Sequence, residues 1–124
     1  MGSDNIAESI MLDKAKDFAV EIINLCKTVK EAKKESVITN QLMRSGTSIG
    51  ANIHESKYAH GTADFISKMQ IALKECYESE YWLELLNRTD CISDEEYKLV
   101  VNRCGQIRRM LISSINTVKE KSQK

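Results

Sequence analysis

Apolar residues recur every three or four positions in four successive stretches of this chain, and no proline interrupts any of them. That spacing places side chains on one face of an α-helix. Because proline ends or kinks helices, its absence from 124 residues favours long continuous helices over the many turns of a sandwich or barrel. We expect one all-α domain over residues 1–124, with helices at roughly residues 9–30, 36–58, 62–87 and 94–120.

Four amphipathic helices joined by short connections predict an antiparallel up-down-up-down four-helix bundle. Local signals place the helix ends. Gly61 is expected to stop the second helix and Thr62 to cap the third, while Ser93 and Glu96 read as a capping box for the fourth. The inward face of the second helix is expected to carry Val37, Ile38, Leu42, Ile49 and Ile53.

The second helix also holds an unusual run of small and polar residues. Gly46 and Gly50 would each cost roughly 1 kcal/mol relative to alanine inside a helix, which suggests a compensating close contact or a bend. Four polar residues recur on one side, at intervals of four, four and three, and predict either hydrogen bonds between helices or, given a cleft, a ligand site. Two of them could instead be buried groups that fix helix register or a subunit contact. The four residues are Arg44, Ser48, Asn52 and Glu55, and the two are Asn52 and Glu55.

The third helix is apolar beyond its core face. At roughly 100° per residue, Ile71, Trp82 and Leu85 gather well away from the inward residues, with Tyr77 and Tyr81 beside them. An exposed apolar patch with an aromatic anchor usually marks an interface. We therefore predict a homo-oligomer whose interface includes Ile71, Tyr81, Trp82 and Leu85.

Charge is balanced overall, with 18 basic and 18 acidic residues, and is uneven locally. Residues 75–96 hold eight acids against one base, a balance of −7, and residues 98–124 hold seven bases against one acid, a balance of +6. The basic fourth helix could contact phosphates or could pair with the acidic third helix. Five bases are candidate nucleic-acid contacts, although they form no single stripe: Arg103, Arg108, Arg109, Lys119 and Lys121.

Few residues in this sequence support an enzymatic function. A di-iron bundle needs Glu-x-x-His pairs, but Ala51 and Lys57 stand three positions before His54 and His60. The four cysteines form no Cys-x-x-Cys pair and read as reduced core thiols. We expect no catalytic, metal or cofactor residues. Without a basic and apolar leader or a membrane-length apolar stretch, we expect a cytoplasmic protein with no membrane partner.

Three segments carry a family resemblance. They are 41–55, Gln-Leu-Met-Arg-Ser-Gly-Thr-Ser-Ile-Gly-Ala-Asn-Ile-His-Glu; 64–75, Asp-Phe-Ile-Ser-Lys-Met-Gln-Ile-Ala-Leu-Lys-Glu; and 78–86, Glu-Ser-Glu-Tyr-Trp-Leu-Glu-Leu-Leu. Together they resemble the bacterial four-helix-bundle family named for the ribosomal RNA intervening-sequence protein. The resemblance implies an up-down bundle, commonly assembled as a five-membered ring, and a relation to accessory proteins of diversity-generating retroelements that bind reverse transcriptase and nucleic acid.

Those accessory relatives are strongly basic, whereas this chain is neutral. By resemblance, Arg44, Ser48, Asn52 and Glu55 match the polar signature of the second helix, and Tyr81, Trp82 and Leu85 match the block in the third; neither set is catalytic. The leading hypothesis is therefore a non-enzymatic, self-assembling helical scaffold that presents a surface to another macromolecule. The alternative is a nucleic-acid-binding accessory protein that acts with a reverse transcriptase or ribosomal RNA.

Overall fold

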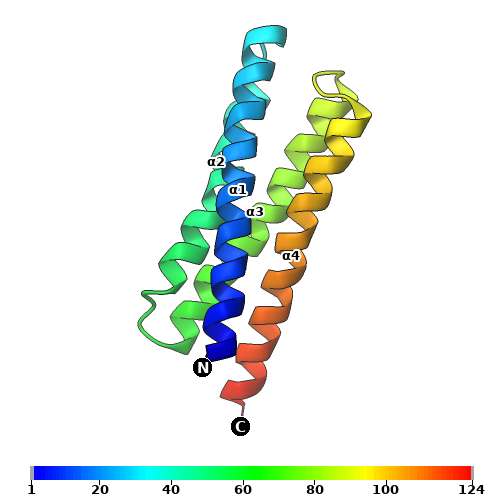
Figure 1. Ribbon diagram of the computed structural model, residues 1–124. Coiled ribbons are helices and arrows are strands. Elements are labelled where there is room, and N and C mark those ends of the chain that lie inside the picture. The colour runs from blue at the N-terminus through cyan, green and yellow to red at the C-terminus, as the bar shows by residue number, and fades with distance from the viewer. Residues whose placement is uncertain (1, 124) are drawn as a thin grey trace.

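The computed structural model describes the backbone of residues 2–123 and the side chains of residues 6–123. Four helices follow one another: α1 (Gly2–Lys33), α2 (Val37–Ser56), α3 (Thr62–Arg88) and α4 (Asp94–Ser122). Each helix packs on the next, and α4 returns to α1, which confirms the all-α up-down bundle (Figure 1). Met1 and Lys124, the ends of the expected domain, lie outside the described residues.

The first two helices end at residues other than those expected, each for a local backbone reason. α1 is longer than expected at both ends, and Lys34, with a φ of 55°, stops it while its N–H donates to the Lys30 carbonyl at 3.0 Å. α2 stops earlier than expected, at Ser56, because the N–H groups of Lys57 and Tyr58 donate to carbonyls only three residues back. Such tight turns commonly finish a helix.

Of the predicted helix caps, the one at the start of α4 is confirmed and the two at the α2–α3 connection are wrong. Ser93 precedes α4, and its hydroxyl accepts a hydrogen bond from the Glu96 N–H at 3.1 Å, which confirms the N-cap. The roles expected of Gly61 and Thr62 are wrong. Gly61 has a φ of 130° and is the residue before α3, and Thr62 is the first residue inside that helix. The left-handed backbone requires glycine here because the chain turns into α3, five residues after α2 has ended.

Buried side chains from all four helices form one core. The largest fully buried side chains include Phe18, Ile22, Leu42, Ile49, Ile53, Met69, Leu83, Leu86, Ile107 and Leu111. The expectation that Val37 faces inward is wrong, since 72% of it is exposed. Five residues separate it from Leu42, which turns it roughly 140° around the helix. The buried stripe of α2 begins instead at Thr39.

The glycines of α2 mark its approach to α1. A Cβ placed on Gly46 would lie 2.9 Å from Ile22 Cγ2, closer than real Cβ contacts allow. A Cβ on Gly50 would lie 3.5 Å from the Ala15 Cβ, an ordinary contact. The close contact predicted from the sequence is therefore the packing of α1 on α2, and only Gly46 is required by it.

The opposite seam, between α1 and α4, is looser. Hollows of about 360 Å³ and about 450 Å³ lie along it and share Asp17 and Glu21 as lining residues. The helices in the described part of the chain include none that is long and apolar enough to cross a membrane. α1 begins and α4 ends at the end of the bundle that holds the α2–α3 connection (Figure 1).

Candidate functional site

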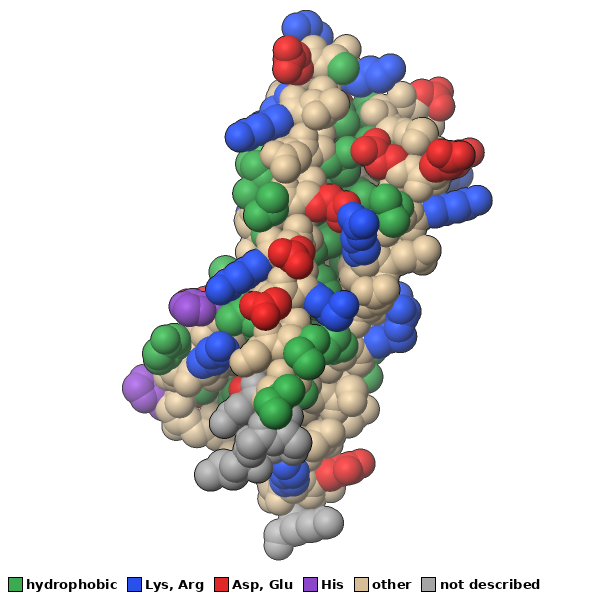
Figure 2. All heavy atoms as spheres, viewed as in Figure 1, with side chains coloured by type: hydrophobic (Ala, Val, Ile, Leu, Met, Phe, Trp, Pro, Cys, Tyr) green, Lys and Arg blue, Asp and Glu red, His purple; other side chains and the backbone are tan. Residues whose placement is uncertain are grey.

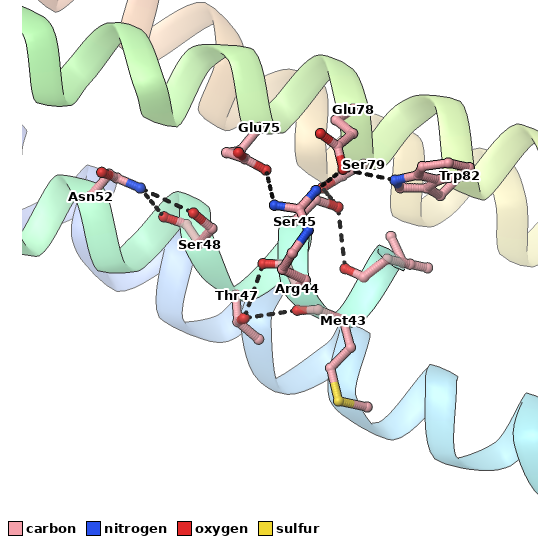
Figure 3. A network of polar contacts seen from close by, with 11 residues as sticks. Met43, Arg44, Ser45, Thr47, Ser48, Asn52, Glu75, Glu78, Ser79 and Trp82 are labelled. Carbon is pink, nitrogen blue, oxygen red and sulfur yellow. Dashed lines mark hydrogen bonds and ion pairs between the residues drawn. The ribbon is translucent and has the colours of Figure 1, made fainter. Parts of the chain in front are cut away.

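Arg44 extends from α2 to two carboxylates of α3. Its Nη1 donates to Glu75 Oε2 at 3.3 Å, and its Nη2 donates to Glu78 Oε2 (Figure 3). Glu75 and Glu78 lie one turn apart, so one guanidinium can reach both, and charge-assisted hydrogen bonds of this kind are stronger than neutral ones. This contact joins the surfaces of α2 and α3.

The other three residues of the α2 polar set make different contacts. The buried Asn52 amide donates to the Ser48 carbonyl at 2.9 Å and to the Ser48 hydroxyl at 3.0 Å, both within α2 (Figure 3). Glu55 is exposed in the single chain, so its burial between helices is wrong, and its burial at a subunit contact stays a prediction. The four residues share a face as predicted from their spacing, but among the described residues only Arg44 carries a side-chain hydrogen bond from that face to another helix.

Glu78 connects this polar set to the aromatic residues of α3. Its Oε2 accepts a hydrogen bond from Trp82 Nε1 at 3.0 Å as well as the one from Arg44. Tyr81 meets Trp82 edge to face, with ring centroids 5.0 Å apart. Arg44 of α2 and the aromatic residues of α3 belong to two sets that were predicted separately. Because Glu78 contacts both Arg44 and Trp82, the two sets form one continuous surface.

Apolar side chains remain exposed around that centre. Tyr77 and Tyr81 are each more than half exposed, Ile71 is 39% exposed, and Trp82 and Leu85 are half-buried. Trp82 also packs against the core. We call the set of Arg44, Glu75, Glu78, Ile71, Tyr81, Trp82 and Leu85 the α2–α3 surface.

Sequence reasoning missed the contacts beneath this surface. The buried Ser79 hydroxyl donates to the buried Ser45 hydroxyl at 2.9 Å, which joins α3 to α2 (Figure 3). It also missed Glu75 and Glu78 as partners of Arg44. The one sequence signal for these contacts was the presence of small polar residues at core positions of α2 and α3. Periodicity cannot show that two residues 34 positions apart, such as Ser45 and Ser79, contact each other.

Two of the five candidate nucleic-acid contacts are held in ion pairs between helices. Arg103 of α4 pairs with Glu21 of α1, and Arg108 donates from Nε to Glu80 Oε2 of α3 at 3.0 Å. Arg108 also lies over the Tyr77 ring, 5.6 Å from its centroid. Burial alone would lower the pKa of Arg108, but the neighbouring Glu80 outweighs it and raises that pKa.

The other three candidate nucleic-acid contacts do not form a cluster. Arg109 and Lys119 are exposed, and Lys121 lines a hollow at the end of the α1–α4 seam. On the face formed by α1 and α4, basic and acidic side chains alternate without a continuous basic area (Figure 2). A strong phosphate-binding surface would need the cations clustered on one face.

Three of the four cysteines lie in the core, as predicted, and Cys91 is only half-buried. The Cys26 thiol is buried, which raises its pKa to about 11, and its Sγ donates to the Thr39 carbonyl at 3.4 Å. The hydrogen bond with Cys76, together with burial, raises the pKa of the Cys104 thiol. Reactive thiols need a lowered pKa. Within residues 2–123 no group of three or more His, Cys, Asp or Glu side chains is placed to hold a metal ion.

Comparison with known proteins adds a family and a fold. The model of the 23S rRNA-intervening sequence protein family matches residues 7–113. Curated protein sequences yield no match. A crystal structure of a protein of unknown function from the S23 ribosomal protein family of Bacteroides thetaiotaomicron is 49% identical, with a TM-score of 0.87. That similarity covers 89% of this chain and 98% of the other.

Proposed function

The chain belongs to the 23S rRNA-intervening sequence protein family, and from that premise we propose that it is a non-enzymatic helical scaffold that assembles with itself. The assembled form presents its surface to another macromolecule. The observation that supports this most is the exposure of aromatic and apolar side chains on α3, a helix that already supplies its other face to the core. A monomer gains nothing from such a patch.

The α2–α3 surface has the composition of an interface. Trp82 and Tyr81 supply rigid aromatic area, and Ile71 and Leu85 extend it. Arg44, Glu75 and Glu78 lie beside the aromatics as charged neighbours. Buried aromatic anchors with a polar rim are typical of stable protein contacts.

Trp82 is suited to burial by a second subunit. Its indole N–H already donates to Glu78, so covering the ring would leave no unsatisfied donor. Its half-buried ring is fixed by the core on one side and by Tyr81 on the other, which lowers the entropy lost on binding. The resemblance to the family implies that such assembly produces a ring, and we take a pentameric ring as the expected form.

The absence of enzymatic activity is part of this proposal. The Cys26 and Cys104 thiols have raised pKa values, and the Ser79 hydroxyl donates to the Ser45 hydroxyl in the core. His54 lies at the surface, where its ring meets the edge of Tyr58. In the described part of the chain, no hydrogen bond joins a histidine ring to a hydroxyl or thiol, the pairing that an activated nucleophile needs.

Light scattering on a size-exclusion column tests the assembly. We expect the wild-type mass to be a multiple of the subunit mass, and Trp82→Ala to dissociate it, since truncating a buried anchor costs about 2 kcal/mol or more per contact. Tyr58→Ala, which removes an exposed tyrosine outside the α2–α3 surface, should leave the mass unchanged. A monomeric wild type would overturn the proposal.

The same column separates the scaffold from the nucleic-acid alternative. A mixed pool of RNA and DNA should shift the protein peak weakly at low salt and leave it unshifted at moderate salt, because isolated surface cations bind phosphates weakly. A stable shift at both salt concentrations would favour the accessory role. In that case Arg109→Glu with Lys119→Glu should abolish the shift, since neither residue is part of an ion pair among the described residues.

A further inference from the structure

The hollow of about 450 Å³ between α1 and α4 has apolar walls and an acidic lining. Val20 of α1 and Leu99 of α4 line it, and they are 58% and 49% exposed. Three carboxylates also line it, those of Asp17, Glu21 and Glu96, and no basic residue does. We call this site the α1–α4 hollow.

One oxygen of Glu21, a residue that lines this hollow, is closed to solvent and lacks a donor. Glu21 Oε2 pairs with Arg103, whereas Glu21 Oε1 is buried and accepts no hydrogen bond from any described residue. A buried acceptor without a partner is costly. Because Glu21 Oε1 is closed to solvent, a docking group cannot reach it, and the α1–α4 hollow instead suits an apolar body with positive charge nearby.

The outer face of α3 carries such a group. Lys74, Tyr81 and Arg88 are exposed and follow one another at intervals of seven residues, so they lie along one line on the helix within roughly 20° per step. Arg88 is bound only loosely, through an exposed ion pair with Glu84 at 3.3 Å. Tyr81 has an apolar ring and a hydroxyl that can donate. We call these three residues the α3 ridge.

We propose that the α3 ridge of one copy docks in the α1–α4 hollow of the next copy. The Tyr81 ring lies against Val20 and Leu99, which form the apolar walls of the hollow. Lys74 and Arg88 then face the carboxylates of Asp17 and Glu96. This inference rests on the proposed self-assembly and names the site that receives Tyr81, the residue that the α3 ridge shares with the α2–α3 surface.

Charge favours this pairing over contact between two α3 ridges. A two-fold axis through Tyr81 would set Lys74 of each copy against Arg88 of the other, and facing like charges destabilise a contact. Docking the cationic ridge against an acidic hollow removes that conflict. Because the two surfaces differ, each copy uses both, and the repeated contact closes into a ring when the rotation between copies allows it.

The test uses one variant for each surface and the mixture of the two. Tyr81→Glu disables the ridge by placing a carboxylate against the acidic hollow, and Leu99→Arg blocks the hollow with a long cation. Tyr58→Glu and Val37→Arg are controls that make the same kinds of change at exposed positions elsewhere. Val20→Arg repeats the hollow test from the other wall. Circular dichroism confirms that each variant is helical before its mass is measured by light scattering.

We expect each single variant to be monomeric and their equimolar mixture to give a peak of twice the subunit mass, because one intact ridge meets one intact hollow. Tyr81→Phe, which keeps the ring that lies against Val20 and Leu99, should leave the assembly intact. An oligomeric wild type whose mass survives Leu99→Arg and Val20→Arg, or a mixture that stays monomeric, would overturn the docking mode and leave self-assembly standing. A monomeric wild type would overturn both.

Discussion

The two sides of this bundle are built from side chains of different size. On the closed side, α2 lies between α1 and α3 and contacts them with Gly46 and Ser45. On the open side, α1 and α4 face each other with long charged residues, including Glu21 and Arg103, and leave hollows between them. Small residues let helix backbones approach, and long charged ones keep them apart. Side-chain size along each seam thus decides which side is complete and which can receive another chain.

The largest expected effect comes from enlarging a residue on the closed side. Ser79→Leu inserts a bulky side chain where Ser79 and Ser45 are both fully buried, and overpacking should lower the free energy of unfolding by about 3 kcal/mol. Denaturation by urea, followed by circular dichroism, measures it. Ser67→Leu, at an exposed position of α3, is the control. Equal stability of the two variants would show that the contact between α2 and α3 can accommodate a larger side chain.

A pair of glycine variants sharpens the comparison within α2. Gly46→Ala forces a Cβ to within 2.9 Å of Ile22, and we expect a net loss of about 1 kcal/mol after the gain in helix propensity. Gly50→Ala meets Ala15 at an ordinary distance and should gain about 1 kcal/mol from propensity alone. The two urea midpoints should move in opposite directions. A stabilised Gly46→Ala protein would mean that α1 and α2 separate easily.

Glu35 fixes the start of α2 on the closed side. Its carboxylate accepts hydrogen bonds from the N–H groups of Ile38 at 2.7 Å and Thr39 at 2.9 Å. Partial burial alone would raise its pKa, but these bonds outweigh that effect and lower it. We expect Glu35→Ala to cost about 1 kcal/mol at neutral pH, as the loss of a helix cap does.

The sign of the pH dependence follows from the lowered pKa. The stabilisation is present above the pKa of the unfolded chain, about 4.3, and disappears as the pH falls through the lower folded value. The difference in unfolding free energy between wild type and Glu35→Ala should therefore shrink in acid. Glu31→Ala, at an exposed position of α1, should show no such convergence. A constant difference down to acid pH would remove Glu35 as the cap.

Periodicity was enough to predict the four helices, their order and most of the core, because the three-and-four spacing depends only on neighbours along the chain. It also placed Arg44 and Trp82 on outward faces. It did not reveal that both bind Glu78, since that contact depends on how α2 and α3 are aligned along their axes. The same limit applies to Ser45 with Ser79 and to the α1–α4 hollow. The prediction that Val37 faces the core was wrong for a local reason. Val37 lies at the end of α2, where a hydrophobic residue need not join the buried stripe.

The smallest expected effect concerns the open side. Arg103→Met keeps the aliphatic stem and removes the charge that pairs with Glu21. Because half of the Arg103 side chain is exposed, solvent screens the pair, and we expect a loss of about 0.5 kcal/mol in the free energy of unfolding at low salt. At 1 M salt, where the Debye length is about 3 Å, the difference should approach zero.

A double-mutant cycle with Glu21→Gln isolates this contact, since each single change also alters hydration around the hollow. A coupling energy below about 1 kcal/mol would fit an open seam held mainly by core packing. The matched cycle on the closed side, Arg44→Met with Glu78→Gln, should give a larger coupling because Glu78 is bound by both Arg44 and Trp82. If Glu21 and Arg103 coupled more strongly than Arg44 and Glu78, the ion pair would hold α1 and α4 together. The hollow between these helices would then resist entry by another copy.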